Sequence, residues 1–372
     1  MSDRKKRDAN LDLLRILSML LIIFLHSIDH SGVLEQAEIS SNIMYFYVRV
    51  AYALCQVCVN CYVMLSGYYL VHSKFRIQKL VTLWMETVFY SIVLKFLFMV
   101  TRQEVFSIVS LIGCFFPIVT GRYWFITIYV GMYLIFPFLN KLVHAMNRKE
   151  HTMLNICLFI LFSLWSSIHP SIAGMNSGGG WGLAWFAVLY LSSAWFRMYY
   201  TPMHKPIILL GIFFLIPLLM AVCQVAANAA GIGILQSIIT NWFRYDSAPV
   251  YLMTIALFAA FLNIHIKNDC ISRVICSVAP LTLGVYLIHA HANVSPWSWS
   301  ILDLPSKMCS AIFPLIQLGC VIAIFIVCIT IDAIRRATVG KLENTNRLNL
   351  FCNAIYKKCW NIYKKCFWRA VR

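Results

Sequence analysis

An arginine and a histidine lie within one long apolar segment near the start of the chain. Residues 11–28 are mostly apolar, yet they include Arg15 and His26. Ionisable side chains are costly inside a lipid bilayer, so an arginine and a histidine at this depth are functional candidates. Their spacing corresponds to about 16 Å along a helix, roughly half of a ~30 Å hydrocarbon core. We therefore expect the two side chains at different depths of the membrane.

His26 is the leading candidate for a catalytic group. A neutral imidazole accepts a proton near pH 7, so it can serve as the general base that activates a hydroxyl. Asp29 follows about one helical turn later and could orient the ring. The alternative is a structural histidine bonded to a backbone carbonyl. Arg15 could clamp a phosphate or carboxylate of a cytoplasmic donor. It could equally reach the headgroups or pair with Asp12.

Two further cations follow the second apolar segment. Arg76 and Lys79 are three residues apart, so a helix would place both on one face, where they could hold phosphates at the inner membrane surface. They could also be ordinary positive flanks of a span. Ser66 and Gly67 precede them and permit close approach of either a neighbouring helix or a ligand. We include Ser66 among the candidate substrate-binding residues.

Polar residues in later segments complete the set of candidate substrate-binding residues. Arg122 and Trp124 begin the fourth apolar segment, at a face that is otherwise poor in cations, although Trp is also usual at membrane interfaces. His289 lies near the outer end of a late segment, where it could join His26 around a cavity. Glu86 is an intramembrane carboxylate that needs a partner, and the sequence does not identify that partner.

The composition identifies the class of protein in which these residues lie. Of 372 residues, 61% are hydrophobic and 12% charged, and the mean hydropathy is +0.75. Soluble domains carry about 25% charged residues, so the chain is expected to be an all-α polytopic membrane protein. The net charge of +17 comes from Lys and Arg at span ends and in both tails, which favours membrane topology and lipid contact over nucleic acid.

Ten full transmembrane spans, with both termini in the cytoplasm, account for the apolar segments and their charged flanks. The basic N-terminus and the first span resemble a signal peptide without a cleavage site, so we expect an uncleaved span. The segment 105–120 is short, contains Pro117, and is interpreted as re-entrant or interfacial. The expected spans are 11–28, 44–71, 80–100, 123–142, 152–169, 181–198, 206–229, 248–265, 274–292 and 309–331.

We divide the chain into a membrane-embedded domain, 1–335, and a basic cytoplasmic tail, 336–372. The tail repeats Ile-Tyr-Lys-Lys-Cys at 355–359 and 362–366, a spacing that suits an amphipathic helix on an anionic leaflet or a solvated basic tail. Cys55, Cys58 and Cys61 form a C-x-x-C-x-x-C series inside a span. A metal site is one interpretation, but small core residues are favoured, and we predict no metal.

Five segments in order resemble the membrane acyltransferase-3 family, whose members are polytopic enzymes that O-acylate surface polysaccharides and related glycans. The resemblance runs from about residue 11 to 335. The arrangement Arg15-x10-His26 resembles the R-x10-H signature of the family, and Arg76-Ile-Gln-Lys79 is similar to its R-x-x-R pair. The other three segments are 64–70 (MLSGYYL), 123–139 (YWFITIYVGMYLIFPFL) and 283–289 (LGVYLIH).

The resemblance implies an acyltransferase of the plasma or inner membrane. Its co-substrate would be cytoplasmic acyl-CoA, with acetyl-CoA as the expected donor and no bound cofactor. The acceptor would be a hydroxyl of a cell-surface polysaccharide or lipid-linked glycan. By position, His26 would be the base, Arg15 would support the donor or the site, and Arg76 and Lys79 would meet the CoA phosphates. Lys79 departs from the pattern, since lysine lacks the bidentate fork of arginine.

Direct attack of the acceptor on the thioester is favoured over a covalent acyl-histidine intermediate. Two other classes of protein remain as alternatives. A transporter or exporter of glycans or lipids would also have ten spans and buried polar residues, but the sequence lacks a convincing inverted repeat. A membrane scaffold that recruits a partner through the basic tail would leave Arg15, His26 and Glu86 without a reason to lie in the bilayer.

Overall fold

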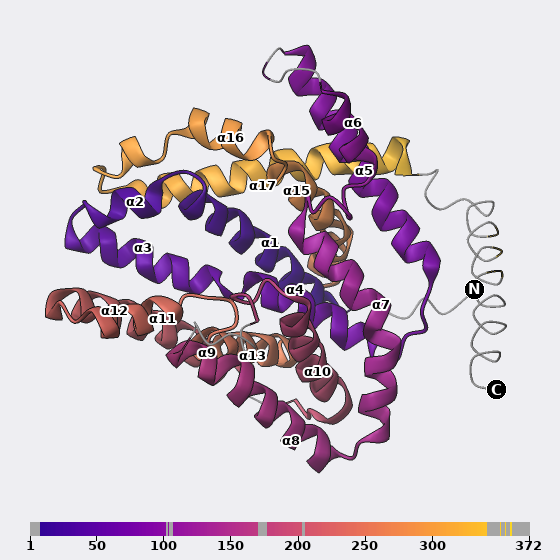
Figure 1. The fold of residues 1–372 in the computed structure, drawn as a ribbon, viewed down its shortest axis with the longest axis horizontal. Coiled ribbons are helices and arrows are strands. Elements are labelled where there is room, and N and C mark those ends of the chain that lie inside the picture. The colour runs from indigo at the N-terminus through magenta and orange to yellow at the C-terminus, as the bar shows by residue number, and fades with distance from the viewer. Residues whose placement is uncertain are drawn as a thin grey trace.

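The fold is a bundle of helices (Figure 1). The computed structural model describes residues 8–340 except 102, 104–106, 170–176, 203 and 204, together with residues 350, 354 and 358. Within these residues there is no β-strand. The helices are α1 (Ala9–Asp29), α2 (Val33–Glu38), α3 (Asn42–Cys55), α4 (Val57–Leu70), α5 (Ile77–Val100), α6 (Ile108–Phe115), α7 (Trp124–Ala145), α8 (Arg148–Phe159), η1 (Ile160–Leu164), α9 (Trp165–Ile168), α10 (Leu183–Tyr199), α11 (Pro206–Ala230), α12 (Gly233–Asn241), α13 (Ala248–Asn263), α14 (Asp269–Val278), η2 (Ala279–Leu281), α15 (Thr282–His289), α16 (Val294–Leu302), η3 (Pro305–Lys307) and α17 (Phe313–Thr338).

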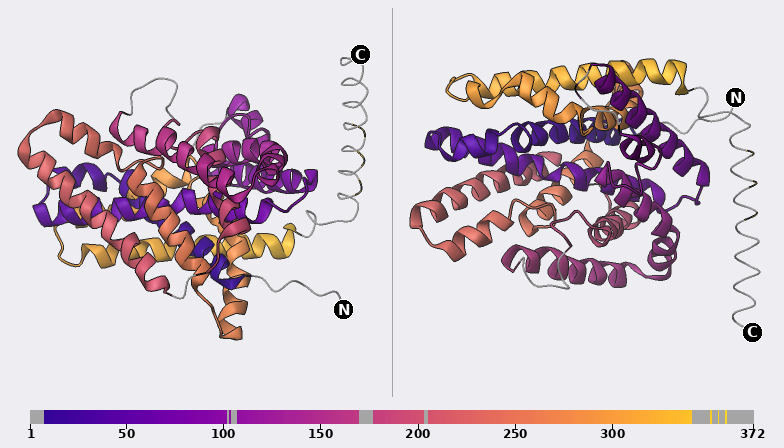
Figure 2. Two further views of the ribbon diagram at one scale, coloured as in Figure 1. Left: turned by 90° about the horizontal axis from the view of Figure 1, so that it is seen from below. Right: turned by 45° about the horizontal axis from the view of Figure 1, so that its top comes forward.

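Helix α1, which carries Arg15 and His26, lies inside the bundle. It contacts α3, α4, α13, α14, α15 and α17, and Leu14, Ile23 and Ile28 on it are completely buried. Figure 1 and the right-hand view of Figure 2 place α17 and α8 at opposite edges of the molecule. Both candidate residues are therefore held on a helix that other helices surround.

The helices agree with the predicted spans in place and type. Every one of the ten predicted spans is occupied by one or more helices. Eight helical segments in the described part are long and apolar enough to cross a membrane, which makes the chain a multi-pass membrane protein. The other two predicted spans are α10, with 17 residues, and α13, with 16. The full count of ten stays a prediction, as do the sides on which the termini lie.

One of the predicted spans is broken by proline. The segment from Asp269 to His289 is long enough to cross the membrane, but the turn η2, which contains Pro280, separates α14 from α15. Proline has no backbone N–H and clashes with the preceding helical turn, so an α-helix cannot continue through it undisturbed. Ala279, Pro280 and Thr282 consequently line a cavity.

The described residues of the segment interpreted as re-entrant or interfacial, 107–120, contain one short helix, α6. Helix α6 has 8 residues and is about 12 Å long, too short to cross a bilayer. Two cations hold it: the Arg122 guanidinium donates to the Ser110 carbonyl oxygen at 2.7 Å and to its hydroxyl at 3.1 Å, and Lys95 Nζ donates to the same hydroxyl at 2.8 Å. Arg122 therefore has a structural role in positioning α6.

Gly67 marks the closest approach of α4 to α10. A Cβ added at this position would lie 3.2 Å from Tyr190 Cα and would collide with the Ser193 hydroxyl. Gly67 therefore permits close approach of a neighbouring helix, which is one of the two roles that we considered for Ser66-Gly67. The tail repeat at 355–366 lies outside the described residues apart from position 358, so its helical interpretation stays a prediction.

Candidate active site

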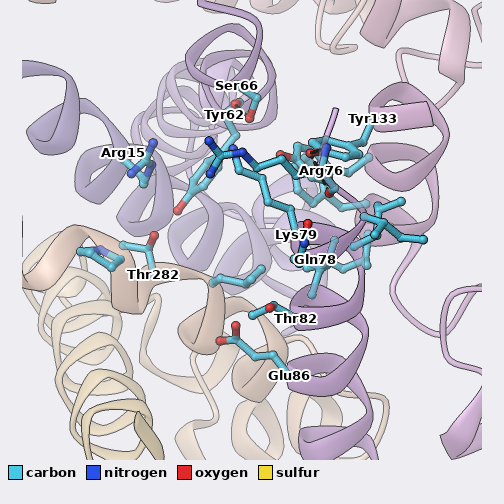
Figure 3. A pocket seen from close by; sticks show the side chains of 18 of the residues that line it. Arg15, Tyr62, Ser66, Arg76, Gln78, Lys79, Thr82, Glu86, Tyr133 and Thr282 are labelled. Carbon is cyan, nitrogen blue, oxygen red and sulfur yellow. Dashed lines mark hydrogen bonds between the residues drawn. The ribbon is translucent and has the colours of Figure 1, made fainter. Parts of the chain in front are cut away.

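A large cavity, which we call the cationic chamber, opens between α1, α4, α5, α7 and α15. Its volume is about 950 Å³, within the range of small-molecule sites. Figure 3 shows Arg15 entering from α1, with Arg76 and Lys79 on another side of the cavity. Five of the predicted site residues line it, namely Arg15, Ser66, Arg76, Lys79 and Glu86.

Backbone hydrogen bonds and an ion pair position the cations of this chamber. The Arg76 backbone accepts from the Tyr133 hydroxyl at 3.2 Å and donates to it at 3.3 Å, which ties the start of α5 to α7. Lys79 lies in the first turn of α5 and Arg76 is the extended residue just before that helix, and both line the chamber. Arg15 pairs with Asp12 at 3.1 Å and still lines the chamber. Three cations thus face a single space suited to an anion.

A smaller cavity, the histidine chamber, surrounds the other end of α1. Its volume is about 210 Å³, and its polar lining includes His26, Asp29, His30 and Arg122. The His26 ring stacks on that of His30, with centroids 4.5 Å apart, and lies 5.1 Å from the ring of His289. Burial lowers the pKa of His30, so this neighbour is neutral at pH 7 and adds no positive charge beside His26.

Hydrogen bonds orient the two histidines that flank His26. His289 Nδ1 lies 2.6 Å from the Val285 carbonyl oxygen, an arrangement that puts the proton on Nδ1. His30 Nδ1 lies 3.1 Å from the Ser295 hydroxyl. His26 Nδ1 is buried and has no hydrogen-bond partner within the described residues. Asp29, which we expected to orient His26, interacts with the Tyr52 hydroxyl and also lines the chamber.

Three aromatic rings form one wall of the histidine chamber, and one of them, that of Trp181, directly follows the glycine-rich loop Gly178–Gly180. Trp124 and Trp181 lie 4.4 Å apart between ring centroids, and Tyr245 contacts both, at 6.4 and 5.9 Å. Behind Tyr245, the completely buried carboxylate of Asp246 accepts from Ser166 at 3.1 Å and pairs with Arg244 at 3.0 Å. The wall is therefore held by a buried polar anchor.

The anchor gives a prediction for the glycine-rich loop. Gly180 has φ +89°, and an added Cβ would lie 2.5 Å from Tyr245 Cβ and 2.9 Å from the Asp246 nitrogen. We expect Gly180→Ala to lower the free energy of unfolding by more than about 2 kcal/mol, since left-handed backbone alone costs roughly 1–2 kcal/mol. Gly178→Ala is the matched control, because its φ is +69° but the added Cβ would meet nothing within 4 Å. Equal losses in thermal unfolding experiments would contradict the assigned contact.

The two chambers adjoin. Tyr62, Phe125 and Leu283 line both of them, and the Tyr62 and Phe125 rings meet edge to face at 6.2 Å. Helix α1 therefore presents Arg15 to one chamber and His26 to the next, with a shared wall between. This arrangement can hold a long anionic molecule by its charged end and bring its other end toward an imidazole.

The structure gathers the predicted site residues into these two chambers. Asp29, Arg122 and Trp124 line the histidine chamber with His26, and His289 lies beside His26. Tyr62, His30 and Arg335 were not among the predicted site residues. Arg335 binds Glu86 at 2.8 Å and supplies the partner that the sequence did not identify. The signal for it was weak, because an arginine at a span end looks like an ordinary positive flank.

The cysteine series lies at the end of α3 and the start of α4. Cys55, Cys58 and Cys61 are buried. No cluster of three or more His, Cys, Asp or Glu side chains suited to a metal occurs in the part of the chain that the structure describes.

Comparison with known proteins identifies the family. The family model described as "Acyltransferase domain", that of the acyltransferase-3 family, matches residues 8–333. No curated protein and no solved structure gave a significant match. The matched range includes the helices that build both chambers, from α1 to most of α17. The chain therefore belongs to the acyltransferase-3 family.

Proposed function

We propose that this membrane protein moves an acetyl group from cytoplasmic acetyl-CoA to a hydroxyl of a cell-surface polysaccharide or lipid-linked glycan. Family membership points to acyl transfer. The observation that carries the finer proposal is the pair of adjoining chambers, one lined by Arg15, Arg76 and Lys79 and the other by His26. The proposed topology has ten spans in the plasma or inner membrane, with both termini and the basic tail 336–372 in the cytoplasm.

The cationic chamber suits the CoA part of the donor. CoA carries several phosphate charges and cannot enter lipid, so its phosphates would stay beside Arg76 and Lys79 at the cytoplasmic face. Arg15, farther along the cavity wall on α1, would meet polar groups of the donor. The long pantetheine arm would then carry the thioester toward the wall that the two chambers share.

The histidine chamber suits a small acyl group and a sugar hydroxyl. Its volume of about 210 Å³ leaves little room for a long acyl chain. The faces of Trp124, Trp181 and Tyr245 offer flat apolar surfaces against which a sugar ring can lie. In this arrangement His26 takes the proton of the acceptor hydroxyl, and the oxygen attacks the thioester carbonyl directly.

The direct test is a transfer assay with the full-length protein in lipid. Radiolabelled acetyl-CoA is supplied with a membrane glycan extract, and label is followed into glycan, with acetyl-CoA binding measured in parallel. Label that reaches glycan supports the proposal. Binding of neither acetyl-CoA nor CoA, together with no transfer, would overturn it in favour of glycan or lipid transport.

The donor site gives a second prediction. Arg76→Gln is expected to weaken acetyl-CoA binding by about 10–100-fold, because a hydrogen bond between charged groups contributes about 1.5–3 kcal/mol and each ~1.4 kcal/mol is tenfold. Lys74→Gln is the matched control, since Lys74 is an exposed cation of the same loop that does not line the chamber. Binding is measured by isothermal titration calorimetry. Equal weakening in both variants would indicate general surface charge and remove Arg76 from the donor site.

A further inference from the structure

The wall shared by the two chambers contains one hydroxyl. Of the three residues that line both chambers, Phe125 and Leu283 are apolar and Tyr62 carries a phenol. If the donor and acceptor sites lie as proposed above, the thioester has to reach this wall, because it joins the CoA part on one side to His26 on the other. A side-chain hydroxyl of this wall that acts on the thioester carbonyl would be that of Tyr62.

The Tyr62 hydroxyl is buried and forms no hydrogen bond of normal geometry within the described residues. Thr282 is its neighbour in the wall of the cationic chamber (Figure 3), and the Thr282 hydroxyl donates its own proton to the Ala279 carbonyl oxygen at 2.8 Å. Buried polar groups are usually paired, and an unpaired one is costly. Other buried tyrosines do have partners: Tyr90 donates to Asp332, Tyr123 to the Leu287 carbonyl and Tyr190 to Asn140.

We propose that Tyr62 is a catalytic residue that donates a hydrogen bond to the carbonyl oxygen of the thioester. A buried donor whose nearest hydroxyl, that of Thr282, is not at normal hydrogen-bond geometry is suited to this role, because it is already desolvated and gives up only that weak contact when the substrate arrives. The phenol keeps its proton throughout and acts as a fixed dipole. This inference rests on the proposed acyl transfer and assigns a residue that the sequence motifs do not single out.

The acceptor oxygen forms a bond to the carbonyl carbon while His26 takes the hydroxyl proton, and the carbonyl electron pair moves to the oxygen that Tyr62 contacts. The tetrahedral oxyanion then collapses, the carbon–sulfur bond breaks, and the thiolate of CoA takes the proton from His26. The products are the glycan ester and free CoA thiol, and both side chains return to their starting state.

Tyr62→Phe tests the assignment, because phenylalanine keeps the ring packed against Phe125 and removes only the hydroxyl. We expect kcat to fall by about 10²–10³-fold, the usual loss when one oxyanion donor is removed, with little change in KM for acetyl-CoA. Tyr251→Phe is the control, because its hydroxyl bonds to Ser192 and it lines neither chamber. We expect its kcat to stay near the wild-type value.

Thermal stability separates a catalytic role from a structural one. Removal of a buried hydroxyl that forms no hydrogen bond of normal geometry should leave the Tm of Tyr62→Phe close to that of the wild type. A lowered Tm with an unchanged kcat would show that the hydroxyl serves the fold and would overturn the proposal. An unchanged kcat with an unchanged Tm would overturn it too. In both cases transfer by the wild type keeps the proposed function intact, whereas a wild type that transfers no label removes both.

Discussion

His26→Ala is expected to lower acyl transfer by about 10²–10⁴-fold, the usual contribution of a general base, while the protein stays folded in the membrane. The imidazole is the group in the histidine chamber that we assign to the acceptor proton, and alanine cannot accept one. Acetyl-CoA binding should persist, because Arg15, Arg76 and Lys79 line the other chamber. The measurement is label transfer to glycan at saturating donor, together with the binding constant for acetyl-CoA.

The matched control for this variant is His265→Ala. His265 lies after α13, outside both chambers, and its ring contacts the Asn263 carbonyl oxygen. Its loss should leave transfer near the wild-type rate. Normal transfer by His26→Ala would remove His26 from the chemistry. A quenched reaction without acceptor also separates the two routes, because a covalent acyl-histidine would leave label on the wild-type protein and direct attack would not.

The sequence predicted the helices that carry this site better than the contacts between residues on different helices. The apolar segments located the helices, and Arg76 and Lys79 line one cavity, although Arg76 is the extended residue before α5 and only Lys79 lies on the helix. The motifs brought His26 and His289 into one set, and the structure places their rings 5.1 Å apart. Short-range periodicity locates the helices because it reflects the geometry of a single helix. The grouping of His26 with His289, which lie on α1 and α15, came instead from their places near the outer ends of two segments.

The shared wall could not be predicted in the same way. Tyr62, Phe125 and Leu283 come from α4, α7 and α15, and only the packing of these helices brings them together. A tyrosine within an apolar span has no sequence signal that distinguishes a paired hydroxyl from an unpaired one. The break between α14 and α15, in contrast, had a sequence signal in Pro280, and the predicted span 274–292 did not take it into account.

The ion network of Glu86, Arg335 and Asp332 also joins helices that are distant in the chain, and the sequence did not predict it. Arg335 binds Glu86 at 2.8 Å and Asp332 at 2.8 Å, and Tyr90 donates to the same Asp332 oxygen at 2.8 Å. Glu86 and Arg335 are 249 residues apart in the chain. The network therefore joins α5 to the end of α17 beside the cationic chamber, and its charges lie almost completely inside protein.

Arg335→Ala is expected to lower the free energy of unfolding by about 3–5 kcal/mol, because it leaves two buried carboxylates without this compensating cation. Arg336→Ala is a demanding control, since it is the adjacent arginine and also binds Asp332, at 3.1 Å. The Arg336 side chain is 35% exposed, compared with 2% for Arg335. Because the Arg336 side chain is partly exposed, this variant should be less destabilised than Arg335→Ala, even though Arg336 also donates to the Pro280 carbonyl oxygen.

Thermal unfolding in mixed micelles compares the two variants under identical conditions. Equal losses would mean that both arginines act as positive flanks of α17 and that the contact with Glu86 adds no stability. The expected difference also has a functional consequence, since Glu86 lines the cationic chamber. Without Arg335, the Glu86 carboxylate would lose this cation and its negative charge would disfavour the phosphates of CoA, so Arg335→Ala should weaken donor binding as well as the fold. Arg335→Ala combined with Glu86→Gln should recover donor binding, because the amide carries no charge.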